Sequence, residues 1–139
     1  MTGHSEKNKT KREQPIPRGI PTVRMMAMPA DTNWLGDIFG GWLMSHADIA
    51  GAVLAYRRAE GKVVTVAVNN FLFLEPVFIG DIVSFYAEID QIGTTSITMN
   101  IDILSERPDV AGPYENIRVA TANITYVHID ADGNPDKVK

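Results

Sequence analysis

The fold is decided by one apolar run with helical spacing, Gly40-Gly41-Trp42-Leu43-Met44-Ser45-His46-Ala47-Asp48-Ile49-Ala50-Gly51-Ala52-Val53-Leu54. A single carboxylate, Asp48, lies in the middle of this run. Burying an ionised carboxylate without partners costs several kcal/mol, so its position needs a reason. One reason is catalysis as a general base, and the other is a structural hydrogen bond to a neighbouring backbone group or to a symmetry-related helix.

The glycine pair Gly40-Gly41 favours the catalytic interpretation of Asp48. A helix N-terminus presents backbone N–H groups without intrahelical partners, and residues without a Cβ let a ligand oxygen approach these groups closely. An oxyanion site needs the same features. We therefore predict an oxyanion site at the start of the helix that carries Asp48.

Strand patterns surround this helix, which we predict from about residue 41 to residue 59 with Gly61 as its end. A short strand before it stops at Pro29, and turn-forming residues connect the two. After Gly61 the pattern changes to period two or to β-branched runs, and a loop with Pro108, Gly112 and Pro113 precedes the last strand. The predicted strands are residues 22–28, 63–68, 71–74, 81–92, 94–105 and 116–129. This order of one strand, one helix and then further strands predicts an α+β fold in which an antiparallel sheet wraps around one long central helix.

The faces of the predicted helix differ. Its bulky apolar residues are expected to fill the core, whereas small and polar residues at helical spacing form a stripe that leaves room for a ligand and for close approach by a second subunit. A homodimer is therefore the minimum unit that we expect. The bulky set is Trp42, Leu43, Ile49, Val53, Leu54 and Tyr56, and the stripe is Gly41, Ser45, Asp48, Ala52 and Ala55.

Composition restricts the class of protein. The chain has 139 residues, which suits one domain (22–130) between a polar, disordered arm (1–21) and a tail (131–139). Its net charge is −4 and its basic excess lies in the arm, so no basic stripe for nucleic acid is predicted. No stretch reaches the ~18 to 20 apolar residues of a membrane span. The absence of cysteine fits a cytoplasmic protein, and the three histidines lack metal-ligand spacing, so no metal is expected.

Longer motifs resemble a known family. They are Ala27-Met28-Pro29-Ala30-Asp31-Thr32-Asn33, Gly36-Asp37-Ile38-Phe39-Gly40-Gly41-Trp42-Leu43-Met44-Ser45, Val63-Val64-Thr65-Val66, Gly80-Asp81 and Gly93-Thr94-Thr95-Ser96. From about Arg24 to Asp130 the chain is similar to the hotdog-fold acyl-CoA thioesterases of the YciA type. The resemblance implies a dimer whose two sheets join into one, commonly assembled further into a trimer of dimers. It also implies an acyl-CoA substrate and no cofactor, since coenzyme A is part of substrate and product.

The resemblance implies roles for particular residues. Asp48 would activate water or attack the thioester directly, and the N–H groups around Gly40 and Gly41 would polarise its carbonyl. Asn33 would position water or thioester from the facing subunit, or else it only caps a turn. The strip Thr94, Thr95 and Ser96 would lie near bound CoA, although a plain hairpin turn explains it equally; Gly36 and Arg107 are further candidates for substrate binding.

Other polar residues of the helix region receive structural interpretations. Ser45 lies one turn before Asp48, where it orients that carboxylate or simply packs. Asp37 is interpreted as a residue favoured near the helix start by the helix dipole rather than as a catalytic acid.

Two departures from the family pattern concern the substrate. Trp34-Leu35 stands where the family usually has Asn before Gly36, which affects the width and polarity of the acyl site. Glu106-Arg107 stands where the family often has a Lys pair, so that only Arg107 keeps the charge for a CoA phosphate.

The predicted function is hydrolysis of acyl-CoA to a free acid and CoA. A hotdog dehydratase or hydratase would need a catalytic histidine near the helix start, and none occurs there. A non-catalytic acyl-CoA-binding module, in which Asp48 is structural, is the alternative from another class.

Overall fold

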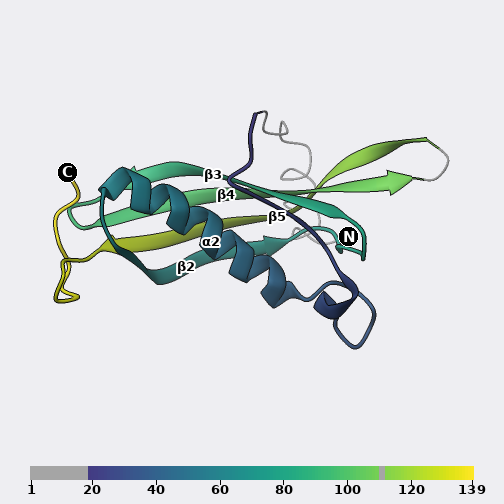
Figure 1. The fold of residues 1–139 in the computed structure, drawn as a ribbon, viewed down its shortest axis with the longest axis horizontal. Helices are drawn as coiled ribbons and strands as arrows, with labels where there is room; N and C mark the ends of the chain where they lie inside the picture. Colours follow the sequence, from purple (N-terminus) through teal and green to yellow (C-terminus); the bar gives the residue numbers. More distant parts are fainter. Residues whose placement is uncertain (1–18, 110–111) are drawn as a thin grey trace, which may run out of the picture.

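One long helix lies across one face of a five-stranded antiparallel sheet in the computed structural model, which describes residues 19–109 and 112–139 (Figure 1). The order of the strands in the sheet is β1-β3-β4-β5-β2. This arrangement confirms the predicted α+β class. The elements are β1 (Val23–Met26), the 3-10 turn η1 (Pro29–Asp31), α2 (Gly40–Ala59), β2 (Val63–Phe73), β3 (Ile82–Ile92), β4 (Ser96–Asp109) and β5 (Gly112–His128). The predicted arm, residues 1–21, lies almost entirely outside the described residues.

Helix α2 begins and ends close to the predicted positions. Its N-cap residue, Phe39, makes no side-chain capping hydrogen bond to the backbone N–H groups of the first turn. At the other end Glu60 adopts the left-handed conformation, with φ 54°, and its N–H donates to Tyr56. The positive charges of Arg57 and Arg58, in the last turn, interact favourably with the negative end of the helix dipole.

The residues of α2 that face the sheet are mostly small. A Cβ on Gly51 would collide with the hydroxyl group of Tyr126, so glycine is required for this close approach. Ile49 and Tyr56, which we expected in the core, are exposed, and that expectation was wrong. The reason is that small side chains let the helix lie close to the sheet, which leaves Ile49 and Tyr56 on the outer side of the helix. The buried residues of the helix are Leu43, Ala47, Ala50, Gly51, Ala55 and Ala59.

Strand β2 is one continuous strand, although the sequence predicted two. Register shifts between Thr65 and Ala67 and between Val68 and Asn70 mark two bulges, which made the period-two pattern appear interrupted. The loop expected between β4 and β5 is also shorter than predicted, because these strands pair to their ends and form a hairpin that extends beyond the rest of the sheet (Figure 1).

The residues after β5 fold back onto the domain. Val138 is buried among the core residues, and its N–H donates to the carbonyl oxygen of Thr94 at 2.8 Å. The C-terminus therefore lies beside the β3–β4 turn, near the end of α2 (Figure 1). The domain limits 22–130 remain predictions. Across the described residues, no helix has the length and apolar content needed to span a membrane.

Candidate active site

Asp48 is held at both its side chain and its backbone. The hydroxyl group of Thr65 on β2 donates to Asp48 Oδ1 at 2.6 Å, and the hydroxyl group of Tyr126 on β5 donates to the backbone carbonyl of Asp48 at 2.7 Å. Thr65 and Tyr126 are opposite one another in the β2–β5 register, so two neighbouring strands reach the same turn of the helix. The Asp48 side chain itself is half-buried and retains contact with solvent.

Neither Thr65 nor Tyr126 was predicted from the sequence. Thr65 is the one hydroxyl-bearing residue in the run Val63-Val64-Thr65-Val66-Ala67-Val68, which is a signal that could have drawn attention to it. Burial raises the pKa of the Tyr126 hydroxyl, and the negative charge of Asp48 raises it further. Tyr126 therefore stays protonated and remains a donor to the helix backbone.

Ser45 does not orient Asp48, so that part of its predicted role was wrong. Its hydroxyl donates to the carbonyl oxygen of Trp42 at 3.1 Å, a bond within its own helix. Thr65 takes the orienting position instead.

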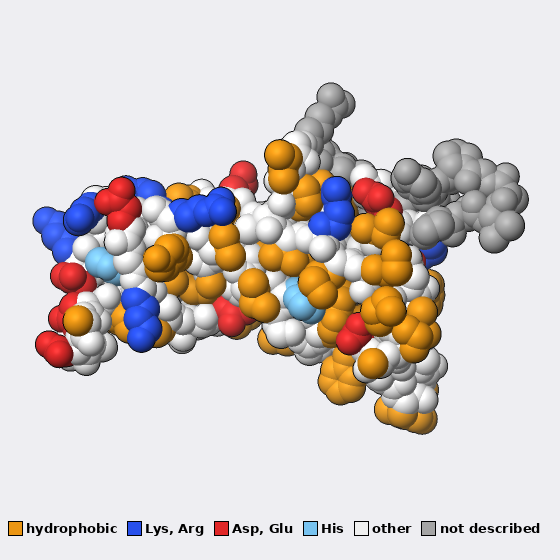
Figure 2. All heavy atoms as spheres, viewed as in Figure 1, with side chains coloured by type: hydrophobic (Ala, Val, Ile, Leu, Met, Phe, Trp, Pro, Cys, Tyr) orange, Lys and Arg blue, Asp and Glu red, His pale blue; other side chains and the backbone are white. Residues whose placement is uncertain are grey.

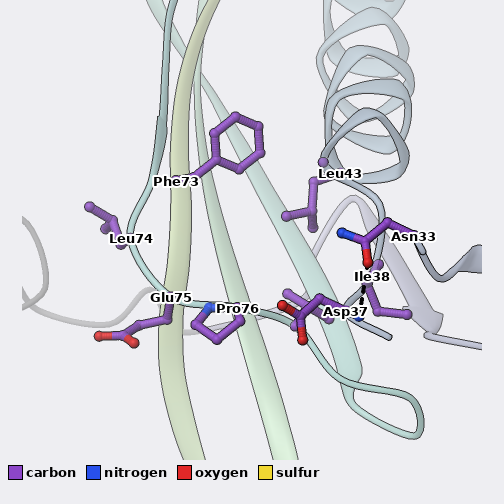
Figure 3. A pocket seen from close by; sticks show the side chains of 10 residues that line it. Asn33, Asp37, Ile38, Leu43, Phe73, Leu74, Glu75 and Pro76 are labelled. Atoms are coloured by element: carbon purple, nitrogen blue, oxygen red, sulfur yellow. Dashed lines mark hydrogen bonds between the residues drawn. The ribbon is translucent and has the colours of Figure 1, made fainter. Parts of the chain in front are cut away.

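A hollow of about 340 Å³ lies beside the start of α2 (Figure 3). Asn33 and Asp37 face it from the loop before the helix, and the Phe73 ring faces it from β2, whereas the side chains of Leu74 and Glu75 point away. A Cβ on Gly40 would lie 3.4 Å from that ring, so the start of α2 and the Phe73 ring are close neighbours. The lining residues are Asn33, Asp37, Ile38, Gly40, Leu43, Phe73, Leu74, Glu75, Pro76 and Val77.

Asn33 caps a turn within its own chain. Its Oδ1 accepts hydrogen bonds from the N–H groups of Leu35 at 2.9 Å and Asp37 at 3.1 Å, while Gly36 adopts a φ of 92° that favours glycine. The amide nitrogen of Asn33 points toward Leu43 at the hollow (Figure 3). Its predicted role in a facing subunit stays a prediction. Trp34 lies at the tip of this turn and is 91% exposed.

The structure does not bring all predicted site residues together within one chain. Asn33, Gly36, Gly40 and Gly41 lie at the start of α2, whereas Asp48 does not line the hollow and lies about 12 Å further along the helix axis than Gly40. The strip Thr94, Thr95 and Ser96 belongs to the opposite end, because the N–H of His128 donates to the carbonyl oxygen of Thr95, and a Cβ on Gly61 would touch the His128 ring. A helix of this length separates the two ends by about 30 Å.

Arg107 forms an ion pair with Asp81, with Nη2 2.9 Å from Oδ2. Asp81 is 2% exposed. The same nitrogen donates to the carbonyl oxygen of Pro76 at 3.1 Å, and the guanidinium lies 4.5 Å from the centre of the Phe78 ring. Contact of Arg107 with a CoA phosphate stays a prediction.

Comparison with known proteins identifies the family. The family model described as "Thioesterase superfamily" matches residues 35–111. The chain belongs to this superfamily. This thioesterase is 46% identical over 120 residues to the acyl-CoA thioester hydrolase YciA of Escherichia coli (strain K12), covering 86% of this chain and 91% of that protein.

Solved structures agree with this assignment. A hexameric hotdog fold thioesterase of Campylobacter jejuni matches with a TM-score of 0.84 and 40% identity, covering 87% of this chain and 91% of that one. A hexameric broad specificity acyl-coenzyme A thioesterase matches with a TM-score of 0.82 and 37% identity, covering 90% and 84%. The predicted hotdog fold and the YciA-type resemblance are confirmed.

Proposed function

We propose that this thioesterase hydrolyses acyl-CoA to a free carboxylic acid and CoA, in sites shared between copies of the chain. The observation that carries the proposal is the half-buried carboxylate of Asp48, which Thr65 holds by one oxygen. Relatives that share this fold are named as acyl-CoA thioester hydrolases. The reaction needs no cofactor, and we expect it to occur in the cytoplasm.

Asp48 acts as the general base in this proposal. The Thr65 hydroxyl occupies Oδ1, and Oδ2 accepts a proton from water as the water oxygen attacks the thioester carbonyl. The C–S bond then breaks, and the leaving thiolate of CoA takes up the proton from Asp48, which restores the carboxylate. Direct attack by the carboxylate, which would form an anhydride, is the alternative within the same site.

Backbone N–H groups at Gly40 and Gly41 polarise the thioester carbonyl. The side chain of the N-cap residue Phe39 does not compete for them, and loss of one such donor typically costs ~3 kcal/mol of transition-state stabilisation. Because Asp48 lies outside the hollow at the start of its own helix, we infer that the hollow of one copy meets Asp48 of another. Asn33 then faces that carboxylate from the hollow.

The assembly in this proposal is a homodimer at minimum and a trimer of dimers in full. The edge strand β2 supports it, because Val64, Val66 and Val68 are exposed on the strand that carries Thr65. Exposed apolar residues on an edge strand favour pairing with another strand. The hexameric state of similar thioesterases points in the same direction.

Replacement of Asp48 tests the mechanism. We expect Asp48→Asn and Asp48→Ala to lower the rate of thiol release by about 10² to 10⁴, with folding and CoA binding retained, because an amide cannot act as a base. Glu60→Gln, which changes an exposed side chain at the end of the same helix, is the matched control. If Asp48→Asn keeps its rate within a few-fold of wild type, the non-catalytic acyl-CoA-binding interpretation replaces this one.

The same assay tests substrate range. We expect activity toward many aliphatic acyl-CoAs, because the hollow is lined by general hydrophobic side chains such as Leu43, Phe73 and Val77. A sharp preference for one aromatic or hydroxylated acyl group would contradict this expectation.

A further inference from the structure

The loop between β2 and β3, residues 74–81, forms one wall of the hollow through Glu75, Pro76 and Val77. This β2–β3 loop is bonded directly to the segment that leads into α2, because the N–H of Ile38 donates to the carbonyl oxygen of Val77 at 2.9 Å. Ile38 lies two residues before Gly40. The position of the β2–β3 loop therefore sets the position of the first N–H groups of α2.

Arg107 on strand β4 contacts the β2–β3 loop at Pro76 and at Asp81. The guanidinium donates through Nε and Nη2 to the two oxygens of Asp81, and through Nη2 to the carbonyl oxygen of Pro76. Asp81 Oδ2 also accepts from the N–H of Phe78 at 3.1 Å. This ion pair, whose carboxylate is buried, thus contacts the loop at Pro76, Phe78 and Asp81.

We propose that Arg107 and Asp81 are positioning residues for thioester hydrolysis, which hold the Pro76–Val77 wall and the start of α2 in register with the substrate. The inference rests on the proposed function. A phosphate that took Arg107 would have to displace a carboxylate that is 2% exposed, and would leave that charge buried without its partner. Displacement of reacting groups by about 1 Å lowers rates by on the order of 10²-fold, so loss of the ion pair should lower kcat.

Two conservative variants separate positioning from direct phosphate binding. Arg107→Lys keeps the positive charge but loses the fork that spans Asp81 and Pro76, and Asp81→Asn removes the ion pair while Arg107 stays. With butyryl-CoA we expect kcat to fall at least about tenfold in both, while inhibition by free CoA and by 3′-dephospho-CoA stays within about twofold of wild type. Arg58→Lys, whose guanidinium contacts the carbonyl oxygen of Lys139 at the far end of α2, is the matched control and should behave as wild type.

The opposite pattern overturns the inference. A phosphate grip predicts that Arg107→Lys and Asp81→Asn retain kcat, and that Arg107→Gln weakens inhibition by CoA more than inhibition by 3′-dephospho-CoA. If Arg107→Lys fails to fold, Asp81→Asn decides alone, because it preserves the shape of the buried side chain.

Hydrogen exchange gives a readout that needs no turnover. We expect faster exchange at residues 75–80 and 38–41 in Arg107→Lys and Asp81→Asn, with unchanged rates in β5. Unchanged exchange in these two segments overturns the inference. A wild-type protein that releases no thiol from any acyl-CoA would instead overturn the proposed function, while the exchange result still judges the role of the ion pair.

Discussion

Helix α2 starts beside an open hollow and ends against packed chain. At its start Phe39 is 55% exposed and makes no side-chain capping hydrogen bond, and Trp34 protrudes nearby. At its end Glu60 closes the helix, Gly61 lies against His128, and Val138 fills the core. Figure 2 shows the same contrast on the surface, with apolar side chains gathered toward the start of α2 and charged side chains toward its end.

The two ends of α2 differ in whether their backbone hydrogen-bonding groups are available to a ligand or already have hydrogen-bond partners. Unused N–H groups at a helix start attract a carbonyl oxygen, whereas a closed helix end contributes mainly to stability. Substitutions near the start of α2 and at Asp48 should therefore affect turnover. Substitutions near its end should affect stability, and those where the helix contacts the sheet should affect stability most strongly.

The largest effect is expected in the middle of α2, where Gly51→Ala would press a methyl group against Tyr126. Overpacking and the strained hydrogen bond to Asp48 should lower the free energy of unfolding by about 3 kcal/mol. Denaturant unfolding measures this change. Adding Tyr126→Phe removes the hydroxyl and should restore part of the loss; a double variant as unstable as the single one would contradict the contact.

Thr65→Val tests whether the surroundings of Asp48 affect turnover rather than stability. The substitution keeps the shape of the side chain but removes the donor to Asp48, so kcat should fall about tenfold with little change in unfolding. Thr98→Val is the matched control, since Thr98 bonds to Thr125 and not to Asp48. Wild-type kcat in the Thr65 variant would show that Asp48 needs no orienting partner.

Val138→Ala tests the closed end and should have the smallest effect. Loss of two buried methyl groups should lower the free energy of unfolding by about 1 kcal/mol and leave kcat unchanged. Thermal unfolding and the thiol-release assay, run on one preparation, measure both quantities. A lower kcat at unchanged stability would mean that the C-terminal end takes part in the reaction.

The sequence predicted the fold and the position of Asp48 more fully than the surroundings of that residue. Helical spacing, the glycine pair and strand periodicity are local signals, and they located α2 and most strands. The contacts of Asp48 with Thr65 and Tyr126 depend on strand register, 17 and 78 residues away in the chain.

Other errors have physical reasons of the same kind. A helix that is apolar on most sides does not indicate which side faces the sheet, so Ile49 and Tyr56 were misplaced. The ion pair of Arg107 with Asp81 joins strand β4 to the loop before β3, which the spacing of charges along the chain does not reveal.

The two bulges of β2 have a consequence for how the length of this chain can change during evolution. At each bulge β2 carries one residue more than β5, Val66 at the first bulge and Asn69 at the second, so that Thr65 stays opposite Tyr126 and Phe73 opposite Ala120. Deleting either extra residue would restore regular pairing and would leave both Thr65 at Asp48 and Phe73 at the hollow facing the helix. Single deletions at these two positions should therefore be tolerated, whereas deleting any paired residue would shift the register of the strand.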